Sequence, residues 1–359
     1  MLRTIIRWGL ALPFLVACTE WTPRVSKGLF TEPYPGLPVQ VDTLFVADEA
    51  SDHYCNGAVP VYWKGKLFCM WQSSAIDEDS PDTHVVYAEP GGPVRPLPRI
   101  EGVACSSGGW IAREDSLIAL VNSWTDPPSV CYSASADGQE WSPLRPVLQA
   151  DGTPLHAIME QDPCFLPGGR LLGAAHFPPG LQVCPVYTDD PSGVKDWKRA
   201  VFTCENLGDQ SRALEPSLYI RADGAVVLLL RDQSSTYRKL VSVSKDKGEH
   251  WGPLAVTDLP DSRSKQCAGN LPDGRIYTVG NLFPRKDRSA LHIALSPDGF
   301  LFNELYELLH ARDLPPRRYE GRAKTLGYSY PKACMAGDTL VIGCSLNKEA
   351  ILLLRCPLP

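Results

Sequence analysis

Short apolar runs, each preceded by a polar turn that contains Gly or Asp, recur along the chain. Six such units begin at Lys64, Glu114, Gly168, Asp223, Asp273 and Gly337. Amphipathic helical patterns are nearly absent, and 29 Gly and 33 Pro residues interrupt the sequence, which favours short strands joined by turns. The units are spaced by roughly 50 to 65 residues, a length that is typical of β-propeller blades with long loops.

A second repeated pattern is the hairpin motif Ser-x-Asp-x-Gly-x-x-Trp, known as the Asp-box. Residues 244–251 match it in full, residues 133–141 match it with one residue fewer before Gly, and residues 296–302 carry Phe in place of Trp. Residues 189–197 and 89–97 look like eroded copies. In such a hairpin Asp accepts backbone N–H bonds, Gly supplies a positive φ and the aromatic ring tucks under the blade. We therefore assign the motif a structural role and no catalytic one.

The repeats together predict an all-β fold, a propeller of six blades with four antiparallel strands each. A propeller ring is usually closed by combining strands from both termini, which removes exposed sheet edges. Residues 41–46 are expected to supply the outer strand of the blade that ends at residues 351–355. A seventh blade within residues 305–330 stays open as an alternative, although that stretch is poorly patterned.

The overall charge and the cysteines exclude several classes of function. The chain of 359 residues has a formal net charge of -6, and its Lys and Arg residues form no basic stripe, so nucleic acid is not an expected partner. The 12 cysteines include no CxxC pair and no Cys/His ladder, so we expect no metal and no cofactor. Most of them lie in strand-like runs and are interpreted as small buried apolar residues.

The N-terminus has the pattern of an export signal. Arg3 and Arg7 precede a short apolar run that ends in Leu-Val-Ala-Cys18. This ending resembles a bacterial lipobox, which implies a signal peptide over residues 1–17 and lipidation of Cys18. A Pro-rich tether over residues 18–38 and a propeller over residues 39–359 would follow, on the bacterial cell envelope and in contact with the membrane through the lipid. The alternative is a plain secretory signal with an incidental Cys.

Polar side chains gather where the inner strands of a propeller begin, around the central axis. In the first unit these are His53 and Asn56, followed by an acidic loop over residues 77–82. Later units supply Glu215 and Gln266 at comparable places. Polar groups at the axial ends of apolar strands are what a sugar-binding site needs, so we expect an oligo- or polysaccharide partner.

Three short segments resemble the sialidase-like glycoside hydrolases. Glu215-Pro216-Ser217 and the strand that ends in Arg231 look like the segment that carries a glutamate and one carboxylate-binding arginine. Arg288, just before an Asp-box, resembles a second such arginine, and Tyr328-Ser329-Tyr330-Pro331 resembles the segment of the nucleophilic tyrosine. The layout is shared over most of residues 50–359, whereas only short motifs match residue by residue.

The resemblance implies an exo-acting glycosidase that removes terminal acidic sugars. Tyr330 would be the nucleophile and Glu215 its base, since a phenol with a pKa near 10 is a poor nucleophile by itself. An acid from residues 77–82, which hold four carboxylates, would protonate the leaving oxygen; Asp79 is the expected one. Arg231 and Arg288 would bind the substrate carboxylate. Asn56, Tyr328 and Gln266 are expected to make further substrate contacts.

One departure from the sialidase pattern opens two alternatives. Sialidases begin their first blade with an arginine in a Phe/Tyr-Arg-Ile-Pro motif, where this chain has His53-Tyr54-Cys55-Asn56. Other sialidase-like propellers are rhamnosidases or lyases that act on rhamnose–uronate linkages and can employ a histidine, which makes His53 a candidate catalytic residue. The remaining alternative is a glycan-binding lipoprotein with no catalytic activity.

Overall fold

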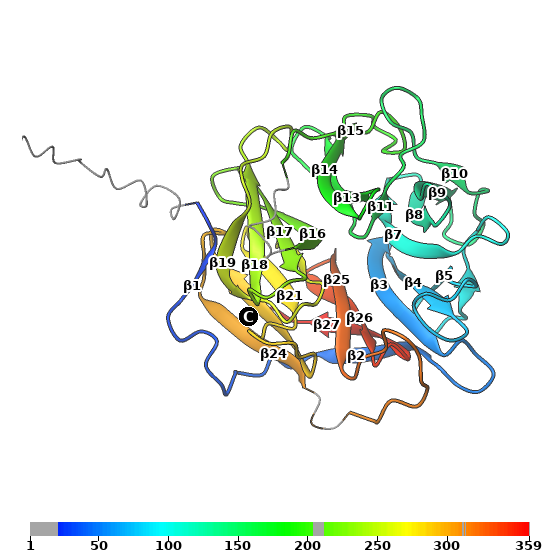
Figure 1. Ribbon diagram of the computed structural model, residues 1–359. Helices are drawn as coiled ribbons and strands as arrows, with labels where there is room; N and C mark the ends of the chain where they lie inside the picture. The colour runs from blue at the N-terminus through cyan, green and yellow to red at the C-terminus, as the bar shows by residue number, and fades with distance from the viewer. Residues whose placement is uncertain (1–20, 204–211, 311, 313, 359) are drawn as a thin grey trace, which may run out of the picture.

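Six small antiparallel sheets stand as blades around a central axis in the computed structural model (Figure 1). It describes residues 21–203, 212–310, 312 and 314–358, and these residues contain no α-helix. None of their elements is a helix long and apolar enough to span a lipid bilayer. The predicted six-bladed propeller is confirmed. The seven-blade alternative is wrong, because β24 (Glu304–His310) is the outer strand of blade five.

The strands of each blade follow one another from the axis outward, except in the last blade. Blade one consists of β3 (Tyr54–Trp63), β4 (Lys66–Ser74), β5 (His84–Ala88) and β6 (Arg95–Pro96). Blade two consists of β7 (Cys105–Ala112), β8 (Leu117–Ser123), β9 (Ser129–Ser135) and β10 (Arg145–Pro146). In blade three two short inner strands pair with the same neighbour: β11 (Ile158–Met159), β12 (Cys164–Phe165), β13 (Leu171–Phe177), β14 (Gln182–Thr188) and β15 (Lys198–Arg199).

Blades four to six complete the ring. Blade four consists of β16 (Ala213–Ile220), β17 (Val226–Asp232), β18 (Arg238–Ser244) and β19 (Ala255–Pro260). Blade five consists of β20 (Cys267–Asn270), β21 (Ile276–Gly280), β22 (Ala290–Ser296) and β24. Blade six consists of β25 (Tyr328–Ala336), β26 (Thr339–Leu346), β27 (Ala350–Cys356) and, from the N-terminal part of the chain, β2 (Gln40–Val46).

The ring closes as the sequence predicts. β2 pairs antiparallel with β27, with Val41 opposite Leu354 and Val46 opposite Ala350, and the two strands lie side by side in Figure 1. A strand from near the start of the chain therefore covers the edge that the C-terminal blade would otherwise leave open.

Residues 21–39 run along the outside of blade five. There β1 (Arg24–Val25) pairs with β23 (Leu301–Phe302), and Trp21, Phe30 and Tyr34 pack against the apolar core of this region. The described part of the predicted tether is therefore packed on the propeller. The predicted signal peptide over residues 1–17 and the lipidated Cys18 lie outside the described residues.

The Asp-box hairpins are closed by their own residues. In residues 244–251 the Ser244 hydroxyl donates to Asp246 (2.9 Å), Gly248 N–H donates to Ser244 Oγ (2.9 Å) and the Trp251 indole donates to the Gly248 carbonyl (2.9 Å). The eroded copy in blade three keeps the bond from the Trp197 indole to the Gly193 carbonyl, whereas Gly193 N–H donates to the Asp190 carboxylate in place of a serine hydroxyl.

Four inner strands carry a β-bulge close to the end at which the strand begins. The register shifts between Asn56 and Val59 in β3 and between Ser107 and Gly109 in β7. It also shifts after Leu214 in β16 and after Ser329 in β25. A bulge re-aims the side chain that it displaces, so these positions direct particular residues towards the axis.

Candidate active site

The bulges in β16 and β25 place Glu215 and Tyr330 in the left-handed backbone region, with φ of 48° and 58°. Each residue is followed by proline. Non-glycine residues in this region cost on the order of 1–3 kcal/mol and cluster at functional sites. The two residues that the sequence predicts as base and nucleophile thus share one unusual backbone geometry.

Arg231 joins these two residues across the axis. Its Nη1 lies 2.6 Å from Glu215 Oε2 and 3.4 Å from the Tyr330 hydroxyl, so one guanidinium nitrogen contacts both groups. The Glu215 and Arg231 side chains are less than 10% exposed. Buried charge-assisted pairs of this kind hold their partners in a fixed geometry. The structure therefore brings together three of the residues that the sequence predicts.

The surroundings of Glu215 and Tyr330 shift their two pKa values in opposite directions. Burial by itself would raise the pKa of Glu215, but Arg231 and Lys265 outweigh it and hold this pKa well below its ordinary value. Burial and the neighbouring Glu215 raise the pKa of Tyr330 well above 10. At neutral pH the pair is therefore a carboxylate beside a protonated phenol, which is the starting state for proton transfer from Tyr330 to Glu215.

Two buried side chains hold the backbone of Glu215. Its N–H donates to Nε2 of His176 (3.1 Å), and its carbonyl accepts from Nε2 of Gln266 (3.2 Å). Gln266 is itself fixed by Lys239, whose Nζ donates to Gln266 Oε1 at 2.9 Å. Gln266, predicted as a substrate contact, is fully buried and positions Glu215 in this structure.

Three more cations surround Tyr330. The ring centre of Tyr330 lies 5.6 Å from Lys265 Nζ, 5.6 Å from the Arg288 guanidinium carbon and 5.3 Å from Lys348 Nζ. Lys348 donates to Glu78 Oε2 at 2.9 Å, and burial lowers the pKa of Lys348 although Glu78 counteracts the effect. These charges attract an anion to the vicinity of Tyr330.

Arg288 differs from the other cations in its partners. Its Nη1 donates to the hydroxyls of Thr325 (3.3 Å) and Ser329 (2.9 Å). Within the part of the chain that the structure describes, it forms no ion pair. Two neutral hydroxyls hold a full positive charge there, which leaves that charge available to an anionic ligand.

A pocket of about 400 Å³ opens beside Tyr330, and we call it the axial pocket. Blades one, two, three, five and six contribute to it. Its walls are formed by Asn56, Gly57, Gln72, Glu78, Asp79, Ser80, Pro81, Thr83, Ala104, Ser106, Ser107, Trp124, Glu160, Lys265 and Tyr330. Trp124 is 47% exposed and can stack on a sugar ring. The size and the mixture of aromatic and polar groups suit one or two sugar units.

The structure separates the four acids of residues 77–82. Asp77 accepts backbone N–H bonds from Asp79 and Arg322, and Asp82 accepts one from Ala75, so both shape the loop. Glu78 and Asp79 reach the axial pocket. Asp79 also pairs with Arg322 at 3.2 Å. The choice that the sequence leaves open is thus narrowed to Glu78 and the predicted Asp79.

The other predicted residues take different places. Asn56 lies on the pocket wall, where its Oδ1 accepts from Ser345 at 2.8 Å. His53 stacks on Tyr319 with ring centres 3.8 Å apart and is not part of the wall. Tyr328 is buried in an apolar cluster between blades five and six. The structure therefore does not bring His53 and Tyr328 together with the axial pocket.

Three charged residues near Tyr330 are absent from the predicted set: Glu160 and Lys265 on the pocket wall, and Lys348, which contacts Tyr330 and Glu78. Lys265 directly precedes Gln266 at the start of β20, and Lys348 lies in the turn between β26 and β27. Glu160 precedes the Asp162-Pro163 step that interrupts the inner strand of blade three. An acidic or aromatic residue before proline at the start of an inner strand is a signal that blades three, four and six share.

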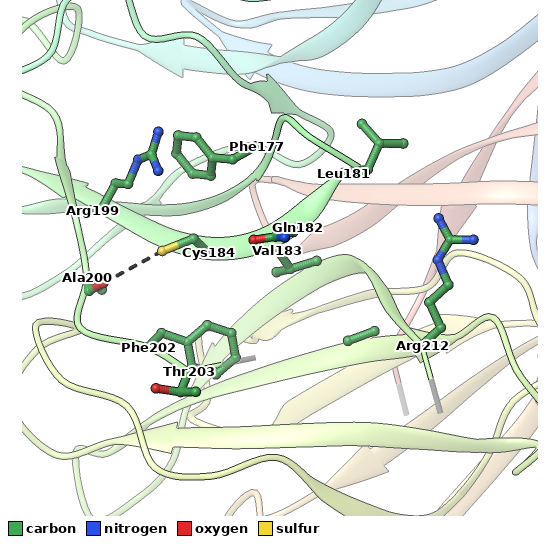
Figure 2. Close-up of a pocket in the computed structure, with 12 residues that line it drawn as sticks. Phe177, Leu181, Gln182, Val183, Cys184, Arg199, Ala200, Phe202, Thr203 and Arg212 are labelled. Carbon is green, nitrogen blue, oxygen red and sulfur yellow. Dashed lines mark hydrogen bonds between the residues drawn. The ribbon is translucent and has the colours of Figure 1, made fainter. Parts of the chain in front are cut away.

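A larger pocket of about 490 Å³ lies between blades three and four, away from the predicted site residues. Figure 2 shows Arg199 and Arg212 on opposite sides of it, with the Cys184 thiol bound to the Ala200 carbonyl on the Arg199 side. None of the described residues that line it is acidic. We therefore assign the chemistry to the axial pocket.

Comparisons with known proteins agree with this architecture. The BNR repeat-like domain family matches residues 114–342, which is more than half of the chain. No curated protein matches the sequence.

Solved structures share the fold at low sequence identity. A protein of unknown function from Dyadobacter fermentans has 14% identity and a TM-score of 0.65, over 90% of this chain and 100% of its own. A sialidase has 18% identity and a TM-score of 0.64 over 94% of this chain. Trypanosoma rangeli sialidase, solved with the inhibitor DANA, has 14% identity and a TM-score of 0.63 over 89% of this chain. The matches span only 35% and 60% of those two sialidases. This chain belongs to the BNR repeat-like domain family, and its six-bladed propeller fold is similar to that of these sialidase structures.

Proposed function

We propose that this protein is an exo-acting glycoside hydrolase that removes terminal acidic sugars from glycans. The observation that carries the proposal is Arg288, a cation beside Tyr330 that, among the described residues, is held by two hydroxyl groups and no carboxylate. A sugar carboxylate, from a sialic or a uronic acid, would supply the missing negative charge. Arg231, Lys265 and Lys348 add to the positive potential at the same place.

The proposed first step uses the contacts around Tyr330. The Tyr330 oxygen attacks the anomeric carbon while its proton passes to the Glu215 carboxylate. The glycosidic C–O bond breaks, and the leaving oxygen takes a proton from Asp79, or from Glu78 on the same wall. The substrate carboxylate, paired with the arginines, offsets part of the charge that holds the pKa of Glu215 low, so Glu215 becomes a better base in the complex.

The second step reverses the proton transfers. The acid residue, now a carboxylate, removes a proton from water, and the resulting oxygen attacks the anomeric carbon. The bond to Tyr330 breaks, and the phenolate recovers the proton from Glu215. The products are a saturated free sugar with retained configuration and the unchanged protein.

The position of His53 favours hydrolysis over elimination. The lyase alternative needs a histidine or a tyrosine as its base, and the candidate histidine, His53, stacks on Tyr319 outside the axial pocket wall. Tyr330, in contrast, lines the pocket, and Arg231 links its hydroxyl to the Glu215 carboxylate.

We also propose that the protein is exported and lipid-anchored through Cys18 on the bacterial cell envelope, on the strength of the lipobox pattern in the sequence. Metabolic labelling with palmitate in a bacterial host tests this. Labelled wild-type chain and unlabelled Cys18→Ser chain are expected, and labelling of the variant would contradict the anchor.

The activity is tested with chromogenic sialosides and glucuronides and with plant acidic glycans, followed by mass spectrometry of the products. A saturated acidic monosaccharide is the expected product. An unsaturated uronate would instead identify a lyase. Binding without any product, unchanged in Glu215→Gln, would identify a glycan-binding protein.

A further inference from the structure

Glu160 is a carboxylate of the axial pocket that the proposed reaction does not use. It lies where the inner strand of blade three is interrupted between β11 and β12, and its side chain is 28% exposed. It shares the pocket wall with Lys265 and Tyr330. Its Oε2 atom is buried and accepts no hydrogen bond from the described residues.

Lys265 fixes the backbone of Glu160 and leaves the carboxylate unsatisfied. Lys265 Nζ donates to the carbonyl of Glu160 at 2.6 Å, whereas it lies 3.7 Å from Oε2, beyond a good hydrogen bond. The charge of Glu160 is therefore balanced by Lys265. Oε2 is shielded from solvent, so a ligand would approach the carboxylate through the exposed part of the side chain, which is 28% exposed on the pocket wall.

His176 approaches the same oxygen from another side. The backbone N–H of Glu215 can only donate, so the His176 Nε2 atom that it contacts must be the acceptor. Burial lowers the pKa of His176, and the neutral ring then carries its proton on Nδ1. Nδ1 lies 3.9 Å from Glu160 Oε2. Glu160 is thus oriented by two groups that do not saturate it, and one of them also holds Glu215.

We infer that Glu160 determines which sugar the axial pocket accepts, by receiving hydrogen bonds from two adjacent ring hydroxyls or from a hydroxyl and an amide N–H. The inference rests on the proposed function, because the sugar would be held with its carboxylate at the cations around Tyr330. An analogue without the matching hydroxyl leaves a buried acceptor unpaired, so the pocket rejects it strongly. Glu160 therefore selects for an acidic ring that carries two adjacent hydrogen-bond donors.

The inference is tested by titration calorimetry on the full chain, with free N-acetylneuraminate and free D-glucuronate as probes. The tighter-binding sugar is then compared with its single-deoxy analogues, in wild type and in Glu160→Ala. Glu160→Gln keeps the shape of the side chain and removes its charge, so it separates the loss of the carboxylate from misfolding. Glu140→Gln makes the same change on an exposed Asp-box turn and is the matched control.

Wild type is expected to bind at least one deoxy analogue tenfold or more weakly than the parent sugar. Glu160→Ala is expected to bind the parent at least tenfold more weakly and to lose that discrimination to within twofold, with an intermediate loss in Glu160→Gln and none in Glu140→Gln. Equal binding of the parent sugar by wild type and Glu160→Ala would overturn the role of Glu160 but not the proposed function. So would weaker binding of the deoxy analogue that persists in Glu160→Ala. A wild type that binds neither sugar would overturn the proposed function, and the inference with it.

Discussion

The Asp-box hairpins and the axial pocket are built in opposite ways. Each hairpin is closed by residues that are near one another in sequence, such as Ser244, Asp246 and Gly248. In the axial pocket, the contact between Arg231 and Tyr330 spans 99 residues, and that between Lys348 and Glu78 spans 270. The hairpins therefore depend on local sequence, whereas the pocket exists only when the ring is closed.

The two regions also differ in what they contact. A Cβ added at Gly248 would come within 2.5 Å of Leu172, and one added at Gly138 within 2.5 Å of Phe68, both in the preceding blade. The hairpin glycines thus let neighbouring blades pack closely. Charged groups around Tyr330, such as Lys348 and Glu215, are buried instead, and their ion-pair partners offset the cost of that burial. Damage to a hairpin should therefore lower stability alone. Damage to the residues around Tyr330 should lower activity, and stability too where it leaves a buried charge without its partner.

The largest expected effect is that of Tyr330→Phe. Loss of the hydroxyl that contacts Arg231 removes the proposed nucleophile, so activity should fall by about 10³-fold or more while the fold stays intact. Steady-state kinetics and thermal unfolding measure the two quantities. Tyr62→Phe, at an exposed position, is the control. Wild-type activity in Tyr330→Phe would remove this residue from the mechanism.

Glu215→Gln should lower both activity and stability. The change leaves Arg231 buried without its carboxylate, which should cost about 3 kcal/mol of unfolding free energy at pH 7. Because the folded pKa of Glu215 is lowered, its contribution is present above the unfolded pKa of about 4.3 and is lost as pH falls through the lower folded pKa. Denaturation curves should therefore converge for wild type and variant towards pH 2. A stability difference that does not change with pH would contradict the ion pair.

Gly248→Ala should act on stability alone. Its φ of 88° and the contact with Leu172 both disfavour a side chain, and we expect a loss of about 2 kcal/mol. Gly252→Ala is the control, because its nearest neighbour lies at an ordinary 3.5 Å. Chemical denaturation measures the loss, and activity per folded molecule should equal that of wild type. Lower activity per folded molecule in Gly248→Ala would contradict the conclusion that the hairpin affects stability alone.

The smallest expected effect is that of Asp246→Asn in the same hairpin. Asp246 accepts from the Ser244 hydroxyl and from the N–H of His250. An amide weakens these bonds by about 1 kcal/mol in total. Exposed Asp258→Asn serves as the reference for the loss of one negative charge. Urea midpoints that coincide for the two variants would show that the Asp-box carboxylate contributes nothing to the hairpin.

The difference between local contacts in the hairpins and long-range contacts around the pocket explains which features the sequence could predict. The blades follow from local patterns, an apolar run after a glycine turn, and the pairing of residues 41–46 with the last blade follows from the need to close an edge. Glu215 and Tyr330 share a signal before proline that reflects their bulged backbone. Lys348 gave no such signal, because its partner Glu78 comes from the other end of the chain.

Two residues that the sequence predicts at the pocket, His53 and Gln266, do not line it. His53 lies directly before an inner strand, but Tyr319, from the segment before β25, covers it by stacking. Gln266 also lies directly before an inner strand, yet its side chain turns towards the backbone of Glu215. Position along a blade predicts nearness to the axis. Only contacts between blades decide which side chains reach the pocket.

The most direct test of the proposed chemistry is to trap the sugar on Tyr330. Full-length protein is mixed with a fluorinated analogue of whichever acidic sugar it hydrolyses, quenched in acid and digested for mass spectrometry. The peptide that contains Tyr330 should gain the mass of the glycosyl group, and Tyr330→Phe should carry no label. A glycosyl group found on another residue, or turnover with inverted configuration and no adduct, would contradict a tyrosine nucleophile in the axial pocket.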